Sequence, residues 1–256
     1  MSRRSWIGLA TMIALIGIWF LTTATGLVST MRFPSPRDFW SALHQIATRG
    51  YANGTLLAHS LHSLKLVLMG FATAVVTGVP LGLWMGWSRK AEAAINPVFL
   101  IIRPIPPLAW IPLAILWLGL GDAAKVMVIW FAAFVPSVIN TFAGVRTIER
   151  PILEASRMLG TPRLRQIVEV VMPAALPMIF TGLRLSLQAS WTTLVAAELV
   201  GALLGIGFVL NVAQQDIYPG MILVGMATVG VLGWVTTRAL GMVERRALAW
   251  NVAARD

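Results

Sequence analysis

Long uncharged stretches alternate with short charged ones along this sequence of 256 residues. Four stretches without Asp, Glu, Lys or Arg lie between Arg4 and Arg32, Lys65 and Arg89, Lys125 and Arg146, and Asp216 and Arg238. Each holds roughly 20 residues or more, which is the length that an α-helix needs to cross a bilayer. The pattern therefore predicts four membrane-spanning helices.

Two further apolar stretches are interrupted by charge. Asn96–Leu120 contains Arg103 and several prolines, and Ala174–Leu204 contains Arg184 and Glu198. With these included, we expect an all-α membrane protein with about six transmembrane helices in a single domain. Composition agrees, because 57% of the residues are hydrophobic and only 12% are charged, whereas soluble domains carry about a quarter charged residues.

The first uncharged stretch also has features of a secretory signal peptide. Arg3 and Arg4 precede an apolar run, and residues 23–25 are small. The uncharged run continues to Met31, which is longer than a typical signal core. We therefore interpret it as a retained span, with cleavage as the alternative.

Lysine and arginine positions predict the orientation, since they are enriched in cytoplasmic loops. An even number of spans puts both termini on the same side of the membrane. That side also receives most of the basic residues. They are the thirteen residues Arg3, Arg4, Arg89, Lys90, Arg146, Arg150, Arg157, Arg163, Arg165, Arg238, Arg245, Arg246 and Arg255. The other side receives the five residues Arg32, Arg37, Arg49, Lys65 and Lys125. Both termini and the loop at 146–173 are therefore predicted to be cytoplasmic. This asymmetry explains most of the net charge of +10 and leaves no separate basic domain for nucleic acid.

The interrupted apolar stretch at Asn96–Leu120 is rich in proline. Pro104, Pro106, Pro107 and Pro112 fall close together, and each removes a backbone donor from a helix. Irregular backbone within a bilayer is tolerated where it packs inside protein or lines a wet cavity. A broken span beside a transport pathway and a kinked, packed helix remain equal interpretations.

The cytoplasmic segment 146–173 is polar and amphipathic. Pro151 suits a first helical turn, and Gly160 suits the left-handed conformation that ends a helix. Thr161 followed by Pro162 predicts a capped restart, and a second helix then leads into the fifth span. A docking surface for a soluble partner is one interpretation. The other is an interfacial connector whose arginines meet lipid head groups.

This segment resembles the signature of binding-protein-dependent ABC importer permeases, E-A-A-x3-G-x9-I-x-L-P. The matching residues are Glu154, Ala155, Ser156, Gly160, Val170, Met172 and Pro173, and three of them (Ser156, Val170 and Met172) depart from it with side chains of similar size. The resemblance implies a type I, MetI-like permease fold with a core at about 56–245. It also implies an ATPase-coupling role for Glu154, Ala155, Ser156, Arg157, Leu159, Gly160 and Pro173.

Two other regions resemble the aliphatic sulfonate, taurine and nitrate branch of that family, at residues 103–125 and 181–198. This resemblance implies a homodimer in a bacterial inner membrane, served by two ATP-binding subunits and an external solute-binding protein. The solute it implies is a small anion such as an organic sulfonate, taurine or nitrate. We expect ATP and Mg to be used by the partner ATPase and no cofactor to be bound by this chain.

Candidate pathway residues are Pro104, Pro106, Pro107, Trp110, Arg184, Trp191 and Glu198. An ionisable group deep in a membrane is costly and therefore marks a candidate functional site. By helical rise, Glu198 lies near the outer boundary, where a gate or interface role competes with simple contact with water. Arg184 lies nearer the cytoplasm, where snorkelling or a bond to another helix competes with an internal cavity.

Enzyme chemistry has little support. No phosphate-binding loop of the Gly-x4-Gly-Lys-Ser/Thr type is present, cysteine is absent, and His59 and His62 lack the further ligands of a metal site. An ion-gradient-driven secondary transporter and a membrane scaffold that recruits a cytoplasmic partner are the alternative functions.

Overall fold

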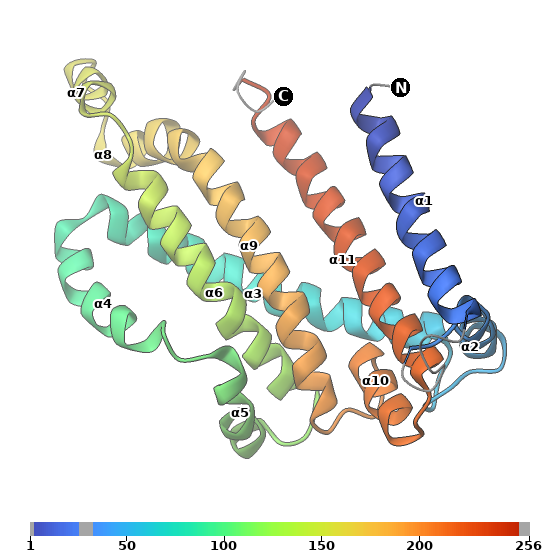
Figure 1. Cartoon of the computed structure of the whole chain (residues 1–256). Coiled ribbons are helices and arrows are strands. Elements are labelled where there is room, and N and C mark those ends of the chain that lie inside the picture. The colour runs from blue at the N-terminus through green and yellow to red at the C-terminus, as the bar shows by residue number, and fades with distance from the viewer. Residues whose placement is uncertain (1–2, 26–32, 251–256) are drawn as a thin grey trace. The chain divides into compact units, whose positions relative to one another are not determined.

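The computed structural model describes residues 3–25 and 33–250, which are built from helices (Figure 1). In chain order these are α1 (Arg3–Ala24), α2 (Pro36–Thr48), α3 (Leu56–Trp87), α4 (Arg89–Ile102), η1 (Pro107–Trp110), α5 (Ile111–Leu118), α6 (Asp122–Arg146), α7 (Arg150–Met158), α8 (Arg163–Arg165), the π-helix η2 (Gln166–Val171), α9 (Met172–Leu199), α10 (Ile206–Gln215) and α11 (Pro219–Ala247). No strand occurs in the described ranges beyond a single bridge between Tyr51 and Gly54. The all-α expectation is confirmed.

Four continuous helical stretches are long and apolar enough to cross a membrane. They are Leu56–Trp87, Asp122–Arg146, Arg163–Leu199 and Pro219–Ala247. A bent pair formed by α4 with η1 and α5 raises the number to five if it is one span. The expected six spans and the orientation of the termini therefore remain predictions. Arg32 and Arg255, which entered the charge comparison, and the end of the first predicted span lie outside the described residues.

The proline-rich stretch is the place where this bent pair breaks. The axes of Arg89–Ile102 and Pro107–Leu118 differ by 86°. Pro107 and Pro112 stand in the first turns of η1 and α5, where a missing N–H is tolerated. The helix is therefore interrupted at the prolines, and the turn at Arg103–Pro106 is exposed.

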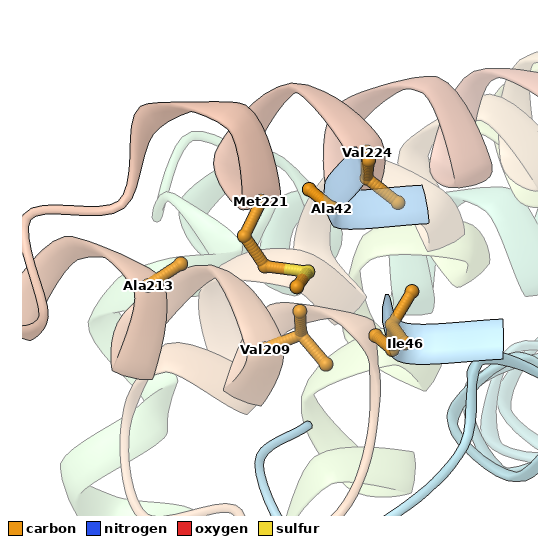
Figure 2. Packing of buried hydrophobic residues seen from close by; sticks show 6 residues of the cluster. All are labelled: Ala42, Ile46, Val209, Ala213, Met221 and Val224. Carbon is orange, nitrogen blue, oxygen red and sulfur yellow. The ribbon is translucent and has the colours of Figure 1, made fainter. Parts of the chain in front are cut away.

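The described chain divides into two compact units. The first comprises residues 1–62 and 202–231. Its core consists of Ala42, Ile46, Val209, Ala213, Met221 and Val224 from α2, α10 and α11 (Figure 2). Helix α2 contributes Ala42 and Ile46, which are its two buried residues. A capping box fixes its start, since Ser35 Oγ accepts the Asp38 N–H and the Asp38 carboxylate accepts the Ser35 N–H at 2.9 Å.

The second unit comprises residues 63–201 and 232–256. Within it α6 and α9 run side by side (Figure 1), and Ser186 Oγ bonds both Ser137 Oγ at 2.8 Å and the Ala133 carbonyl at 2.7 Å. Helix α3 approaches α6 closely at Gly82. A Cβ at that position would lie 2.7 Å from both Thr141 Cβ and the Val138 carbonyl oxygen. Small residues at such contacts let helix backbones pack in a membrane.

Candidate functional site

Helix α7 presents two different faces. It begins after Glu149, whose backbone is extended, with Pro151 in the first turn as expected. Ser156 is buried, whereas the Met158 and Leu159 side chains are 88% and 86% exposed. Figure 1 shows α7 beyond the end of α6 that leads into it. The helix therefore packs one face on the protein and offers an apolar ridge to solvent.

A left-handed glycine makes the corner after α7. Gly160 has φ +72°, and its N–H donates to the Arg157 carbonyl while the Thr161 N–H donates to the Ser156 carbonyl. A Cβ at Gly160 would meet no atom within 4 Å. The requirement for glycine is therefore conformational and not steric, and the left-handed conformation expected from the sequence is confirmed.

The restart after the corner differs from the expectation. Thr161 was expected to cap the next helix with Pro162 at its first position. Instead α8 begins at Arg163, Pro162 occupies the cap position, and no side chain accepts a bond from the first turn. The prediction was wrong because Pro162 itself has an extended backbone, with φ −65° and ψ 150°, so the helix begins one residue later, at Arg163.

A buried glutamine joins α7 to the second helix. Gln166, which is 2% exposed, donates from Nε2 to Ser156 Oγ at 2.6 Å and to the Leu153 carbonyl at 3.0 Å. Ser156 Oγ in turn donates to the Leu153 carbonyl at 2.8 Å. Sequence reasoning missed Gln166. The sequence signal that could have found it is a polar residue among the apolar residues Leu164, Ile167 and Val168.

The second helix continues without interruption from α8 through η2 into α9. Residues Arg163–Leu199 form one apolar helical stretch of 37 residues. The π-helical turn ends immediately before the first residues of α9, where Pro173 stands. Because a proline ring conflicts with an ordinary α-helical bond at this place, a wider turn accommodates it. Gln166 therefore links α7 to a helical stretch that continues into α9.

The candidate pathway residues of α9 bond neighbouring helices. Glu198 is fully buried and accepts a bond from Ser63 Oγ of α3 at 2.8 Å. Trp191 donates from Nε1 to Thr236 Oγ1 of α11 at 3.0 Å. Arg184 forms an ion pair with Glu244 of α11. The interpretation of Glu198 as a solvated boundary residue is wrong, and the helix–helix bond expected for Arg184 is present.

The candidate residues before α6 separate into two groups. Pro104 and Pro106 lie in the exposed turn between α4 and η1, and Pro107 starts η1. Trp110 instead stacks on Phe131 of α6, with ring centroids 4.1 Å apart and planes 11° from parallel. The structure therefore brings Trp110 onto α6 and leaves the prolines at the bend, without gathering the seven pathway candidates into one site.

His59, one of the two histidines weighed as metal ligands, bonds backbone groups instead. His59 is fully buried, its Nδ1 accepts the Gly205 N–H at 3.0 Å, and its Nε2 lies 3.0 Å from the Tyr51 carbonyl oxygen. These contacts fit the tautomer with the proton on Nε2. Within the described ranges, no group of three or more His, Asp or Glu side chains is arranged to hold a metal ion.

Comparison with known proteins identifies the family. Residues 78–248 match the family described as "Binding-protein-dependent transport system inner membrane component". The chain belongs to this family. It is thus a multi-pass permease subunit of a binding-protein-dependent ABC importer, a transport subunit without enzyme activity of its own. Its partners, in general terms, are an ATPase chain and a solute-binding protein.

Two curated relatives align over nearly the whole permease. The taurine transport system permease protein TauC of Escherichia coli (strain K12) is 32% identical over 98% of this chain and 92% of its own length. The putative aliphatic sulfonates transport permease protein SsuC of Bacillus subtilis (strain 168) is 32% identical over 97% and 89%.

A solved structure supports the permease fold. The MetNI methionine ABC transporter, in an inward-facing conformation, contains a chain that superimposes with a TM-score of 0.65. The match covers 75% of this chain and 95% of that one at 20% identity. The likeness confirms the expected MetI-like fold and carries no information on the solute.

Proposed function

We propose that this permease imports a small organic sulfonate or a similar anion across a bacterial inner membrane as a homodimer with two ATP-binding subunits. The relatives named for taurine and aliphatic sulfonates support this class of solute. Solute selection rests mainly with the external binding protein, and the permease supplies the passage. ATP and Mg are used by the ATPase subunits.

The single observation behind the coupling role is the construction of the α7 corner. Met158 and Leu159 offer an exposed apolar ridge that fits a cleft in a soluble subunit. Glu154, Ala155 and Arg157 lie on the same short helix. The buried bond from Gln166 to Ser156 joins that helix to α9. ATP-driven closure of the two ATPase subunits then draws α7 with them and changes the position of α9.

The homodimer is supported by apolar side chains on and after α5. Leu116 and Trp117 are 79% and 59% exposed, and Leu120, in the following loop, is 68% exposed. Large exposed apolar patches indicate a protein or lipid contact. In the proposed dimer a second copy of the chain covers part of this surface, beside the bend at which the α4–α5 pair turns.

The coupling role predicts different effects for two substitutions at Gly160. Valine is strongly disfavoured at φ +72°, whereas asparagine tolerates the left-handed conformation. A cost of about 1–2 kcal/mol on the corner corresponds to a factor of roughly 5–30 in its population. We expect Gly160→Val to lower ATP-dependent uptake by about that factor, and Gly160→Asn to keep most of it.

Uptake is measured with radiolabelled taurine and short alkanesulfonates in proteoliposomes that contain the ATPase and binding protein. Equal amounts of each variant in the membrane serve as the control for insertion. Unchanged transport by Gly160→Val would contradict the coupling role. Uptake driven by an ion gradient without ATP would indicate a secondary carrier, and no uptake of any tested anion would contradict the solute class.

A further inference from the structure

A basic cavity lies behind α7. It has a volume of about 500 Å³ and is formed by the end of α3, the start of α4, the end of α6, α7 and η2. The volume lies within the roughly 300–1,000 Å³ that small-molecule sites occupy. Four arginines line it: Arg89, Arg146, Arg150 and Arg157.

The charge in this cavity is only partly balanced. Arg146 forms an ion pair with Glu92, and Glu154 is the acidic side chain among the lining residues. Within the part of the chain that the structure describes, Arg89, Arg150 and Arg157 form no ion pair. The lining is therefore net positive, and the N–H groups of these three guanidinium groups can donate hydrogen bonds to a bound anion.

The apolar lining gives the cavity a second chemical character. Val145 and Val171 are buried in the core beneath it, and Trp87 and Leu153 pack on that core. Trp87 ends the long apolar helix α3, and tryptophan at a span end is typical of the membrane–water boundary. The cavity thus combines a positive rim with an apolar floor beside the end of a helix that is long and apolar enough to span a membrane.

From this arrangement we infer that the cavity binds a phosphate-type anion, supplied by the head group of an anionic phospholipid or by free phosphate. Guanidinium groups bind phosphate through paired N–H donors. Basic pockets at the cytoplasmic ends of membrane helices suit anionic head groups.

Occupancy has a mechanical consequence. Arg150 and Arg157 lie on one face of α7, while Arg89 belongs to α4. A bound anion would therefore connect α7 to the start of α4 and restrain the segment that we assign to ATPase coupling. This consequence rests on the proposed function. Binding itself requires neither the solute nor the ATPase, so its failure would leave the proposed function standing.

Binding is tested on the purified full chain in a non-ionic detergent. Native mass spectrometry follows titration with dihexanoyl phosphatidylglycerol, dihexanoyl phosphatidylcholine and inorganic phosphate. We expect saturable binding of the anionic lipid over the zwitterionic one and competition by phosphate. Phosphate that binds as tightly as the lipid would identify the free anion as ligand, whereas phosphate that competes only weakly would identify the head group.

Paired variants locate the site. The double substitution Arg89→Gln with Arg150→Gln removes two charges from the cavity, and it should weaken binding by roughly tenfold or more, as expected for the loss of charge-assisted hydrogen bonds. The matched control, Arg163→Gln with Arg165→Gln, removes the same charge from α8, outside the cavity, and should change affinity by less than about twofold.

Three results would overturn the inference. One is equal binding of both lipids to the unaltered chain, and a second is equal weakening by both variant pairs. The third is tighter binding of an acidic peptide such as oligoglutamate than of either phosphate source, which would assign the cavity to a protein partner. Circular dichroism checks that the variants remain helical, and the unaltered chain provides a test that does not depend on their folding.

Discussion

At the scale of single residues, buried polar side chains form hydrogen bonds whose partners could not be predicted from the sequence. Glu198 accepts a bond from Ser63, which is 135 positions away in the chain. Gln166 reaches the α7 helix over a separation of 10 residues. A buried polar group without a partner is costly, so each of these side chains requires its neighbour to be in place. The identity of that neighbour depends on helix packing and not on local sequence.

Replacement of Gln166 by leucine should loosen α7 specifically. The change removes the donor to Ser156 Oγ and to the Leu153 carbonyl. Losing such buried bonds costs about 1–3 kcal/mol. We therefore expect amide exchange in α7 to accelerate by roughly 5–150-fold, as measured by hydrogen–deuterium exchange.

The matched control is Gln188→Leu on α9, because Gln188 is exposed and undergoes the same chemical change. It should leave exchange in α7 unaltered. Equal protection of α7 from exchange in the Gln166→Leu variant and in the unaltered chain would show that the Gln166 hydrogen bonds do not stabilise α7.

At the scale of helices, local sequence chemistry explains starts, ends and breaks, whereas close packing explains the small residues inside. The proline-rich turn and the Gly160 corner follow from backbone restrictions of those two residue types. Gly82 is different, because its backbone conformation is ordinary for a helix. Its requirement comes from Thr141 and Val138 of α6, which occupy the space that a side chain would need.

Gly82→Leu should separate α3 from α6. Its Cβ alone would lie 2.7 Å from the Val138 carbonyl oxygen, so the helices must shift. Overpacking of this kind costs about 1–3 kcal/mol or more, and we expect a clearly lower melting temperature in detergent.

Gly230→Leu on α11 is the control for the Gly82 change. A Cβ at Gly230 meets no atom within 4 Å, and the substitution adds the same apolar side chain. It should leave the melting temperature nearly unchanged. Equal effects of the two variants would show that close approach of α3 to α6 is not limiting for stability.

At the scale of the whole molecule, the distribution of charge predicts which side of the membrane each loop occupies. The absence of cysteine from the sequence makes this prediction accessible to single-cysteine labelling. Leu159 after α7 and Trp40 on α2 are 86% and 69% exposed. We expect Leu159→Cys to be assigned to the cytoplasmic face and Trp40→Cys to the outer face.

The measurement uses a membrane-impermeant maleimide. In intact spheroplasts it should label Trp40→Cys and spare Leu159→Cys, and in inside-out vesicles the pattern should reverse. Transport activity of each single-cysteine variant checks that the topology is intact. Labelling of both positions from the same side would contradict the odd number of spans that is predicted between residues 40 and 159.

The sequence by itself determined the membrane class, the apolar helices, the α7 corner and the permease family. These follow from properties that are local or periodic, since bilayer thickness sets span length and glycine and proline set backbone geometry. The contacts of Glu198, Gln166 and Gly82 are known only from the tertiary structure. So is the basic cavity, whose arginines come from α4, α6 and α7. Each depends on which helices pack together, and no spacing along the chain specifies that packing.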